Sequence, residues 1–490
     1  MTGLDQKAAL TARLDRLAWG RFHTVVTVAL SLGWALDAFE TNIIGSVLGE
    51  VRKVWHLSPT QGSALVSSWV LGIFVGAVLF GHYSDLLGRK RMFIFTLVWY
   101  AGFSVATAFS WDFVSLLAFR FLAALGVGGE YSAVTAAMVE FIPQRHRGKA
   151  SALILGAFPV GAMVSALLAD YFLNHFSANV GWRLGFGAGA VLAVLGVWVR
   201  YAIPESPRWL ATHGRLDEAE RVVSAVEKSL AANAARLEPI KPGPQRPMAA
   251  TPSTVPAPPG GAFAQGLREL FSQYRARLSM ACSLNFAQAS VVYGMLAVLS
   301  IIILPTVKVP STHMPFFYFV GNLASLGGSL LAVVLIDTWG RKGTVTLGYM
   351  MTTLAMFYLY FAKTPQTVLL GYSAVMFSVI WASNTAYIVT SEILPVRHRA
   401  TGLGISVAVG RIGAFSAPIL LSLIYERTNK PGLALLLLTA MTLPGPIAAV
   451  IWCVKGTEAK HCSLEEVARD GNADGNGATS KNPQLAGPKA

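Results

Sequence analysis

Residues 81–91 read GHYSDLLGRKR, and residues 335–343 read LIDTWGRKG, so an acid followed by a Gly-Arg-Lys run occurs twice in the chain. Asp85 and Asp337 are 252 positions apart (337 − 85 = 252), and Glu140 and Glu392 show the same shift (392 − 140 = 252). The second pair lies in EFIPQRHR, residues 140–147, and EILPVRHR, residues 392–399. Two motifs that keep their register over this distance predict two structural halves related by duplication.

The segments between these motifs are mostly apolar. Hydrophobic residues make up 54% of the 490 positions and charged residues only 13%, whereas a soluble domain carries about 25% charge. Apolar stretches of about 20 residues can cross a ~30 Å hydrocarbon core. The composition therefore predicts an all-α membrane protein with twelve transmembrane helices in two pseudo-symmetric six-helix bundles. The stretches lie near residues 22–45, 62–82, 91–110, 113–141, 149–173, 183–203, 278–304, 314–336, 343–362, 367–392, 400–424 and 432–455.

The placement of the basic residues explains the net charge of +14 without a nucleic-acid partner. Residues such as Arg89, Arg91, Arg341 and Arg397 fall in alternate short loops. This positive-inside pattern predicts that these loops and both termini are cytoplasmic and that the partner surface is the lipid bilayer. The first 20 residues are polar and charged, which predicts no cleavable signal peptide. Short outer loops favour a bacterial inner membrane.

Residues 204–277 interrupt the apolar pattern. Residues 214–236 are charged and Ala-rich, which favours one or two surface helices, and a Pro-rich run follows to Gly261. Such a run predicts an extended, partly disordered linker. The predicted organisation is an N-terminus over 1–21, bundles over 22–203 and 278–455, a cytoplasmic linker over 204–277 and a cytoplasmic tail over 456–490.

The loop motif that begins at Gly81 resembles the signature of the major facilitator superfamily, and it recurs in both halves. Arg120, GVGG over residues 126–129, Glu140 and PESPR over residues 204–208 resemble the branch that holds sugar porters, organic-ion transporters and bacterial metabolite:proton symporters. The resemblance implies the major facilitator fold with a substrate site between the bundles and alternating access. We further expect no cofactor, since a proton gradient drives such transporters, and a functional monomer.

Three segments bear on the substrate. Sugar porters carry a Gln-rich motif in the seventh span, whereas this span reads NFAQAS over residues 285–290. Arg411, in GRIGAFSAP over residues 410–418, matches an arginine in the eleventh span of organic-anion and nicotinate-type transporters. LDAFE over residues 36–40 also resembles the first span of bacterial nicotinate and metabolite symporters. The resemblance thus implies an organic anion as the substrate.

Five ionisable residues lie well inside the predicted spans, where charge is costly and marks functional sites. They are not duplicated: Asp37 corresponds to Ala289 (289 − 37 = 252), and Arg120 corresponds to Tyr372 (372 − 120 = 252). Residues with a structural role tend to be kept in both halves of a duplication, whereas residues that bind a substrate or carry protons tend to occur in one half. The five residues are Asp37, Glu40, Arg120, Glu130 and Arg411.

Helix depth predicts one pairing among these charges. At 1.5 Å per residue, Asp37 and Arg120 lie roughly 8 and 10 Å from the outer face. A guanidinium stabilises the charged form of an adjacent carboxylate until the two separate, so we predict that Asp37 and Arg120 carry the proton. The alternative is a static ion pair that only locks the helices. Glu40 is a second candidate carrier, and Glu130 is either a further proton stop or a packing acid.

Arg411 is predicted to bind a substrate carboxylate, because it lies roughly 16 Å into its span and presents a planar fork of donors. The alternative is that it pairs with an acid or with helix-end carbonyls. Amide and aromatic side chains at helical spacing complete a pocket for a flat ring with polar edges, or are ordinary contacts between helices. These side chains are Trp34, Asn285, Gln288, Trp381, Asn384 and Tyr387.

The charged residues of the repeated loop motifs predict gating contacts at the cytoplasmic face. An acid beside a basic run can pair with an arginine of a neighbouring helix or with a helix N-terminus. Such pairs would close the cytoplasmic side and break when it opens. The predicted gating residues are Asp85, Arg89, Glu140, Arg147, Asp337, Arg341, Glu392 and Arg399.

Together these patterns predict proton-coupled uptake of a small organic anion, an aromatic or heterocyclic monocarboxylate such as nicotinate. Three alternatives stay open: a sugar:proton symporter, a drug or organic-cation:proton antiporter, and a nutrient sensor that binds without transporting. The Gly-Pro-rich motif of exporters is matched only loosely by GAFPVG over residues 156–161. No nucleophile–base set and no metal-ligating cluster occur, so we predict neither an enzyme nor a metal site.

Overall fold

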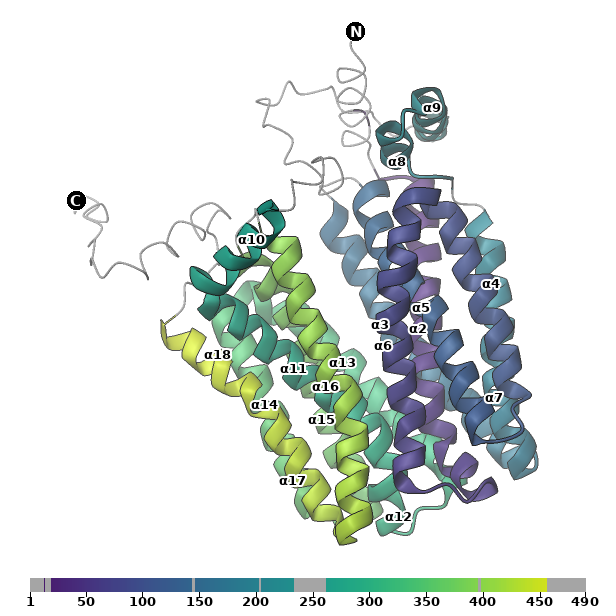
Figure 1. Ribbon diagram of the computed structural model, residues 1–490, viewed down its shortest axis with the longest axis vertical. Coiled ribbons are helices and arrows are strands. Elements are labelled where there is room, and N and C mark those ends of the chain that lie inside the picture. Colours follow the sequence, from purple (N-terminus) through teal and green to yellow (C-terminus); the bar gives the residue numbers. More distant parts are fainter. Residues whose placement is uncertain are drawn as a thin grey trace, which may run out of the picture.

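A computed structural model describes residue 13 and residues 19–142, 146–201, 204–232, 261–394 and 398–455. Within these ranges the chain is helical and contains no strand. Twelve helices are long and apolar enough to cross a membrane, which confirms the predicted fold class. They form two bundles that stand side by side in Figure 1, with the early helices in purple and blue and the late helices in green and yellow.

Each bundle supplies six of the spans, and three shorter helices lie between the bundles in sequence. The first bundle contains α2 (Arg21–Val54), α3 (Pro59–Leu87), α4 (Arg89–Ala108), α5 (Phe113–Phe141), α6 (Arg147–His175) and α7 (Ala178–Tyr201). The short helices are α8 (Pro207–Thr212), α9 (Leu216–Ala232) and α10 (Gly261–Ser272). The second bundle contains α11 (Arg275–Val298) with its π-helical and α-helical continuations η2 (Leu299–Ile303) and α12 (Leu304–Thr306), η3 (Ser311–His313), α13 (Met314–Thr338), α14 (Arg341–Phe361), α15 (Pro365–Ile393), α16 (Arg399–Thr428), α17 (Pro431–Thr442) and α18 (Pro444–Lys455).

The duplication predicted from the motifs is visible in the helix boundaries. α5 and α15 are related by the same shift at both ends (365 − 113 = 252 and 393 − 141 = 252). Asp112 and Thr364 cap the two helices through equivalent side-chain hydrogen bonds. Gly88 and Gly340, in the repeated loop motif, have φ angles of 102° and 86°. Glycine is favoured there because it lacks a Cβ atom, so the motif encodes the same helix-to-helix turn in both halves.

The two bundles meet at the end of the molecule away from α8, α9 and α10. α3 packs against α16, and α6 packs against α13. Near the start of α3, Oγ of Ser63 lies 2.5 Å from Oγ of Ser422, and Thr60 donates to Glu426 at 2.7 Å. Figure 1 shows the bundles converging toward α12 and diverging toward α10. We call the α12 end the far face and the opposite end the linker face; the bundles are joined at the far face.

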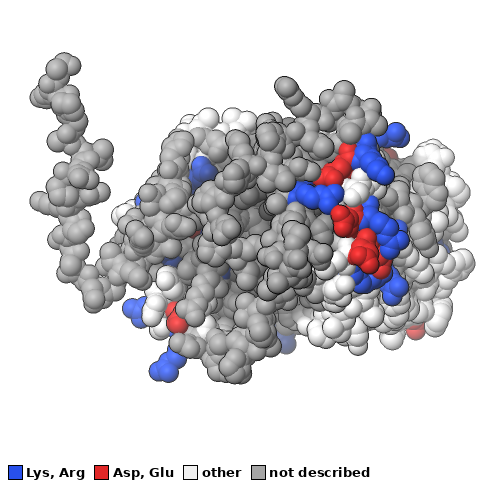
Figure 2. Space-filling model, turned by 90° about the horizontal axis from the view of Figure 1, so that it is seen from above, with Lys and Arg blue, Asp and Glu red and all other residues white. Residues whose placement is uncertain are grey.

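Acidic and basic side chains alternate on the described part of the linker face, where α9 packs against α2 (Figure 2). Arg215 contacts Glu218 at 2.7 Å, and Arg13 contacts Glu227 at 2.7 Å. The hydrogen bonds from Arg215 lower the pKa of Glu218 below its usual value. Exposed pairs of this kind add little to the stability of a fold, and the first of them is local to the start of α9.

Candidate functional site

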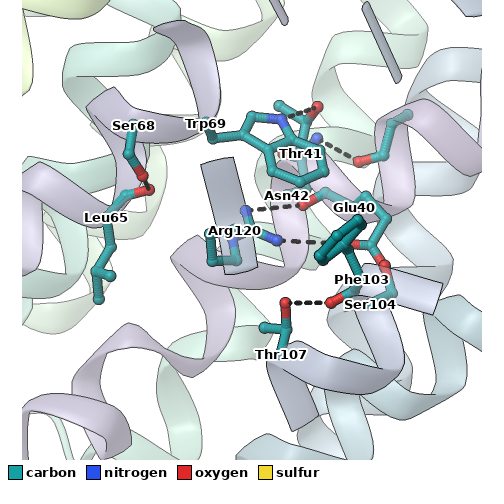
Figure 3. A network of polar contacts seen from close by, with 11 residues as sticks. Glu40, Thr41, Asn42, Leu65, Ser68, Trp69, Phe103, Ser104, Thr107 and Arg120 are labelled. Carbon is teal, nitrogen blue, oxygen red and sulfur yellow. Dashed lines mark hydrogen bonds and ion pairs between the residues drawn. The ribbon is translucent and has the colours of Figure 1, made fainter. Parts of the chain in front are cut away.

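A buried ion pair joins α2 to α5 inside the first bundle. Nη1 of Arg120 lies 3.2 Å from Oε2 of Glu40, and Nη2 of Arg120 donates to the backbone carbonyl of Glu40 at 3.3 Å (Figure 3). Each side chain is 1% exposed. Removing one partner of such a pair leaves an uncompensated buried charge, which destabilises a protein by about 3–5 kcal/mol. The pair therefore ties the two helices together as long as both charges are present.

Depth alone pairs Arg120 with Asp37, whereas the structure places Glu40 against the guanidinium; the part of Asp37 beside Arg120 stays a prediction. The first span was expected to end near residue 45, but α2 continues to Val54 and buries polar residues such as Glu50. Glu40 is 14 residues from the end of α2 (54 − 40 = 14), whereas Arg120 is 7 residues from the start of α5 (120 − 113 = 7). α2 therefore projects about 10 Å beyond α5, and this stagger brings Glu40, one turn beyond Asp37, to the level of the guanidinium.

Aromatic rings complete the surroundings of the Arg120 guanidinium. Its central carbon lies 4.0 Å from the ring centroid of Trp69 and 5.0 Å from that of Phe186. Ser104 donates to the Glu40 carboxylate at 3.4 Å (Figure 3). A desolvated cation over an aromatic face gains about 2 kcal/mol. The sequence prediction missed these rings because an aromatic residue inside an apolar span looks the same whether it packs on a cation or on other apolar side chains.

Gly189 of α7 makes room for the Glu40 carboxylate. A Cβ atom at position 189 would overlap Oε1 of Glu40 and lie 3.2 Å from the ring of Phe39. Gly187, on the same helix, has open space at the equivalent point, with no heavy atom within 4 Å. Gly189 thus belongs to the site although it carries no functional group, and for that reason the sequence prediction missed it.

Asp37 and Glu130, the other acids predicted to carry protons, are buried at different depths. Asp37 is 6% exposed and Glu130 is 1% exposed. Asp37 lies one helical turn from Glu40 along α2. Glu130 follows Arg120 by ten residues on α5 (130 − 120 = 10), which places it roughly 15 Å nearer the linker face. Asp37, Glu40 and Glu130 are thus buried at different depths of the first bundle, and their part in proton transfer stays a prediction.

Gln288 and Trp381 are among the side chains of the second bundle with a buried polar atom that has no hydrogen-bond partner in the described part of the structure. Gln288 donates to Asn285 at 3.0 Å, and Asn285 donates to the backbone carbonyl of Ala281 at 3.0 Å. The side-chain oxygen of Gln288 is left unpaired, as is the indole N–H of Trp381. Because buried polar groups are normally paired, these two atoms are candidates for contact with a substrate.

Arg411 lies in the neighbourhood of the Asn285–Gln288 pair. It is half-buried, and its Nη1 donates to the hydroxyl of Tyr293 on α11 at 3.1 Å. A Cβ atom on the adjacent Gly410 would lie 3.0 Å from the backbone oxygen of Asn285, so α11 and α16 are in close contact at this level. Tyr293 was not among the predicted site residues, although it lies on the same helix as the two amides.

The remaining predicted pocket residues have separate surroundings. Trp34 is buried in α2. Asn384 donates to Ser329 at 2.9 Å and so joins α15 to α13. This bond fits the alternative interpretation of Asn384 as an ordinary contact between helices. Tyr387 is 39% exposed. Among the predicted substrate residues, the amides of α11 and Arg411 thus lie on two helices that are in direct contact.

Two of the eight predicted gating residues form an ion pair. Nε of Arg341 lies 3.1 Å from Oε2 of Glu392, and each side chain is 20% exposed. This pair joins α14 to α15 within the second bundle. Arg399 starts α16. The side chains of Asp85, Arg89, Glu140, Arg147 and Asp337 lie outside the described part of the structure.

Twelve apolar helices in two duplicated bundles, with charged side chains buried among them, define a membrane transport protein. The family model described as "Sugar (and other) transporter" matches residues 26–470, and the chain belongs to this family, within the major facilitator superfamily.

Similar proteins support the assignment over the full length of the chain. The niacin transporter NiaP of Acinetobacter baylyi is 29% identical over 461 residues, which cover 94% of this chain and 99% of that protein. The putative niacin/nicotinamide transporter NiaP of Bacillus subtilis is 26% identical and is covered to 96%, with 89% of this chain matched. The inward-open structure of the xylose transporter XylE from Escherichia coli superposes with a TM-score of 0.71 at 20% identity, covering 91% of this chain and 99% of that chain. The similarity to XylE supports the fold of this chain and carries no information on its substrate.

Proposed function

We propose that the chain imports a small organic anion, an aromatic or heterocyclic monocarboxylate such as nicotinate, together with protons. The observation that carries this proposal is Arg411, which is 12 residues from the start of α16 and 17 from its end (411 − 399 = 12 and 428 − 411 = 17). A guanidinium at this depth presents a planar fork of donors that suits a carboxylate. Full-length similarity to two proteins named for niacin transport supports the same substrate class.

In this proposal, proton coupling runs through the buried acids of the first bundle. The contact with Arg120 favours the charged form of the Glu40 carboxylate, and separation of the pair removes this stabilisation, so that the carboxylate accepts a proton more readily. Asp37, one turn away, and Glu130, nearer the linker face, provide further positions for the proton. The driving force is the proton gradient, so the protein needs no cofactor.

The proposed orientation places the linker face in the bacterial cytoplasm and the far face outside the inner membrane. The basic runs of the repeated loops support it through the positive-inside rule. The contacts of Ser63 with Ser422 and of Thr60 with Glu426 then close the outer side, so the conformer is inward-facing. Alternating access requires these contacts to break when the outer side opens.

The substrate class is tested by thermal shift of the purified protein with nicotinate, benzoates, nicotinamide, sugars and organic cations. Nicotinate at about 100 times its dissociation constant is expected to stabilise the wild type by about 2.7 kcal/mol. Arg411→Ala is expected to weaken nicotinate binding about 30-fold or more, since losing a buried charge partner costs at least about 2 kcal/mol and 1.4 kcal/mol is tenfold. Arg427→Ala, on the exposed end of the same helix, is the matched control and should bind as the wild type does.

Stabilisation by sugars in place of anions would favour the sugar symporter, and stabilisation by organic cations would favour the cation antiporter. Anion binding that is equal in the wild type and in Arg411→Ala would remove Arg411 from the site. Binding without uptake into proteoliposomes under a proton gradient would favour the nutrient sensor.

A further inference from the structure

The far face carries a pocket that lies away from Arg411. Its volume is about 410 Å³, within the range of about 300–1,000 Å³ for small-molecule sites. Arg411 is 17 residues from the far-face end of its helix (428 − 411 = 17), or roughly 25 Å, whereas the pocket lies at the helix ends themselves. It is lined by Gly49, Arg52, Lys53 and Leu57 from the first bundle and by Ser300, Pro305, Lys308, Val309, Pro310, Ser311 and Met314 from the second.

Three cations and two neighbouring carboxylates define the charge at this pocket. Arg52, Lys53 and Lys308 line it. Glu50 accepts hydrogen bonds from Lys53, at 3.2 Å, and from Ser311. Glu426, the second carboxylate near this edge of the interface, is bonded to Thr60 and also attracts the Arg52 guanidinium, which leaves a net charge of +1 (3 − 2 = 1). The pocket therefore has an excess of positive charge, and Lys53 and Lys308 are both exposed to solvent.

Arg52 links this pocket to the closed junction of the bundles. Its Nη1 donates to the backbone carbonyl of Ile301 in η2 at 3.1 Å, and its Nε donates to the carbonyl of Leu57 at 3.4 Å. A guanidinium has five N–H donors, so these two bonds leave others available to an anion. An anion bound by the remaining donors of Arg52 would lie beside its bond to Ile301, a contact that crosses from one bundle to the other.

Each of these cations occurs at only one of two equivalent positions of the duplication, whereas the backbone turn near them occurs in both halves. His56 and Lys308 are equivalent (308 − 56 = 252) and share left-handed φ angles of 50° and 58°. Arg52 corresponds to Leu304 (304 − 52 = 252) and Lys53 to Pro305 (305 − 53 = 252). The turn is therefore a feature of the scaffold, and the three positive charges are not required by it. They also lie on the face that the positive-inside rule tends to deplete of cations.

We propose that the far-face pocket, defined by Arg52, Lys53 and Lys308, is an outer binding site that collects a small carboxylate before the bundles open to the central site. This inference rests on the proposed function, because it assumes an anionic substrate that enters from the far face. A positively charged cleft raises the local concentration of an anion and its association rate, and the effect falls with ionic strength. The pocket is thus expected to lower KM for uptake and to leave kcat unchanged.

Uptake by proteoliposomes of neutral lipid tests the pocket through a double variant, Lys53→Gln with Lys308→Gln. The matched control is Lys363→Gln with Lys430→Gln, which removes the same charge from exposed loop positions of the same face outside the pocket. At about 0.01 M salt, where the Debye length is about 30 Å, we expect KM for nicotinate to rise about 3- to 10-fold in the pocket variant with kcat retained. At about 1 M salt, where the Debye length is about 3 Å, the difference should vanish. Equal effects in both double variants, or no effect in either, would overturn the inference.

A direct measurement of anion binding tests the outer site independently of the proposed transport function. Benzoate and nicotinate are titrated by calorimetry into Arg411→Ala protein in neutral detergent, with and without the two pocket substitutions. Residual weak anion binding that the pocket substitutions remove would support the outer site, even if the wild type failed to transport nicotinate and the proposed function fell. Absence of any such binding would overturn the outer site, even if wild-type uptake of nicotinate depended on Arg411.

Discussion

Replacing Arg120 by methionine is expected to lower the free energy of unfolding by about 3–5 kcal/mol and to abolish proton-driven uptake. The methionine keeps the length of the side chain but removes the cation, so the Glu40 carboxylate, 1% exposed, is left without its ion-pair partner. Thermal unfolding in detergent measures the first effect, and accumulation of substrate in proteoliposomes under a proton gradient measures the second. Arg183→Met is the control: Arg183 also lies on an aromatic ring of the first bundle, at 4.4 Å from that of Trp182, and donates to backbone carbonyls.

A second substitution separates the structural role of this pair from its role in coupling. In the double variant Glu40→Gln with Arg120→Met neither member of the pair is charged, so neither is left without its partner, and removal of a whole buried ion pair is often neutral or stabilising. We expect the double variant to recover most of the lost stability and to stay inactive in proton-driven uptake. A double variant that is stable and still accumulates substrate would show that the pair only locks α2 to α5, the alternative considered for it from the sequence.

The number of spans and the duplication were predictable because both depend on local sequence. Apolar length marks each span, and the Gly-Arg-Lys motif recurs with glycines that adopt the same φ > 0 turn at Gly88 and Gly340. The far-face end of α2 was not predictable in this way. Glu50, Arg52 and Lys53 look like loop residues in the sequence, yet α2 continues through them because they lie where the two bundles meet. Their helical state depends on a partner surface 250 or so residues away in the chain.

The five intramembrane charges were recognisable from their types, whereas their partners were not. Which acid faces Arg120 depends on the axial stagger of α2 against α5, and a shift of one helical turn exchanges Asp37 for Glu40. Similarly, Arg411 was expected to serve a ligand, and its hydrogen bond to Tyr293 follows from the packing of α16 on α11. Residue type therefore predicts which positions carry a buried charge. Which group each charge contacts is determined only when the helices pack together.

Gly189→Ala is expected to lower the free energy of unfolding by about 1–3 kcal/mol, the usual effect of adding a methyl group to a filled interior, and to reduce uptake strongly. The new Cβ would overlap Oε1 of Glu40. That carboxylate cannot simply swing aside, because Arg120 and Ser104 hold it in a fully buried site. Either Glu40 leaves Arg120 or α7 moves away from α2, and both outcomes disturb the ion pair.

The neighbouring Gly187 provides the matched control, since a Cβ there meets no atom within 4 Å. Gly187→Ala makes the same chemical change on the same helix and should leave stability and uptake unchanged, or raise stability slightly because alanine favours helix over glycine. The decisive comparison adds Glu40→Asp to Gly189→Ala. Aspartate is one methylene shorter, so its carboxylate withdraws from the new methyl group. The two substitutions together should therefore be less damaging than the sum of their separate effects, as expected for residues in direct contact. Additive losses of stability would mean that the methyl group disturbs the packing of α7 without acting on the carboxylate.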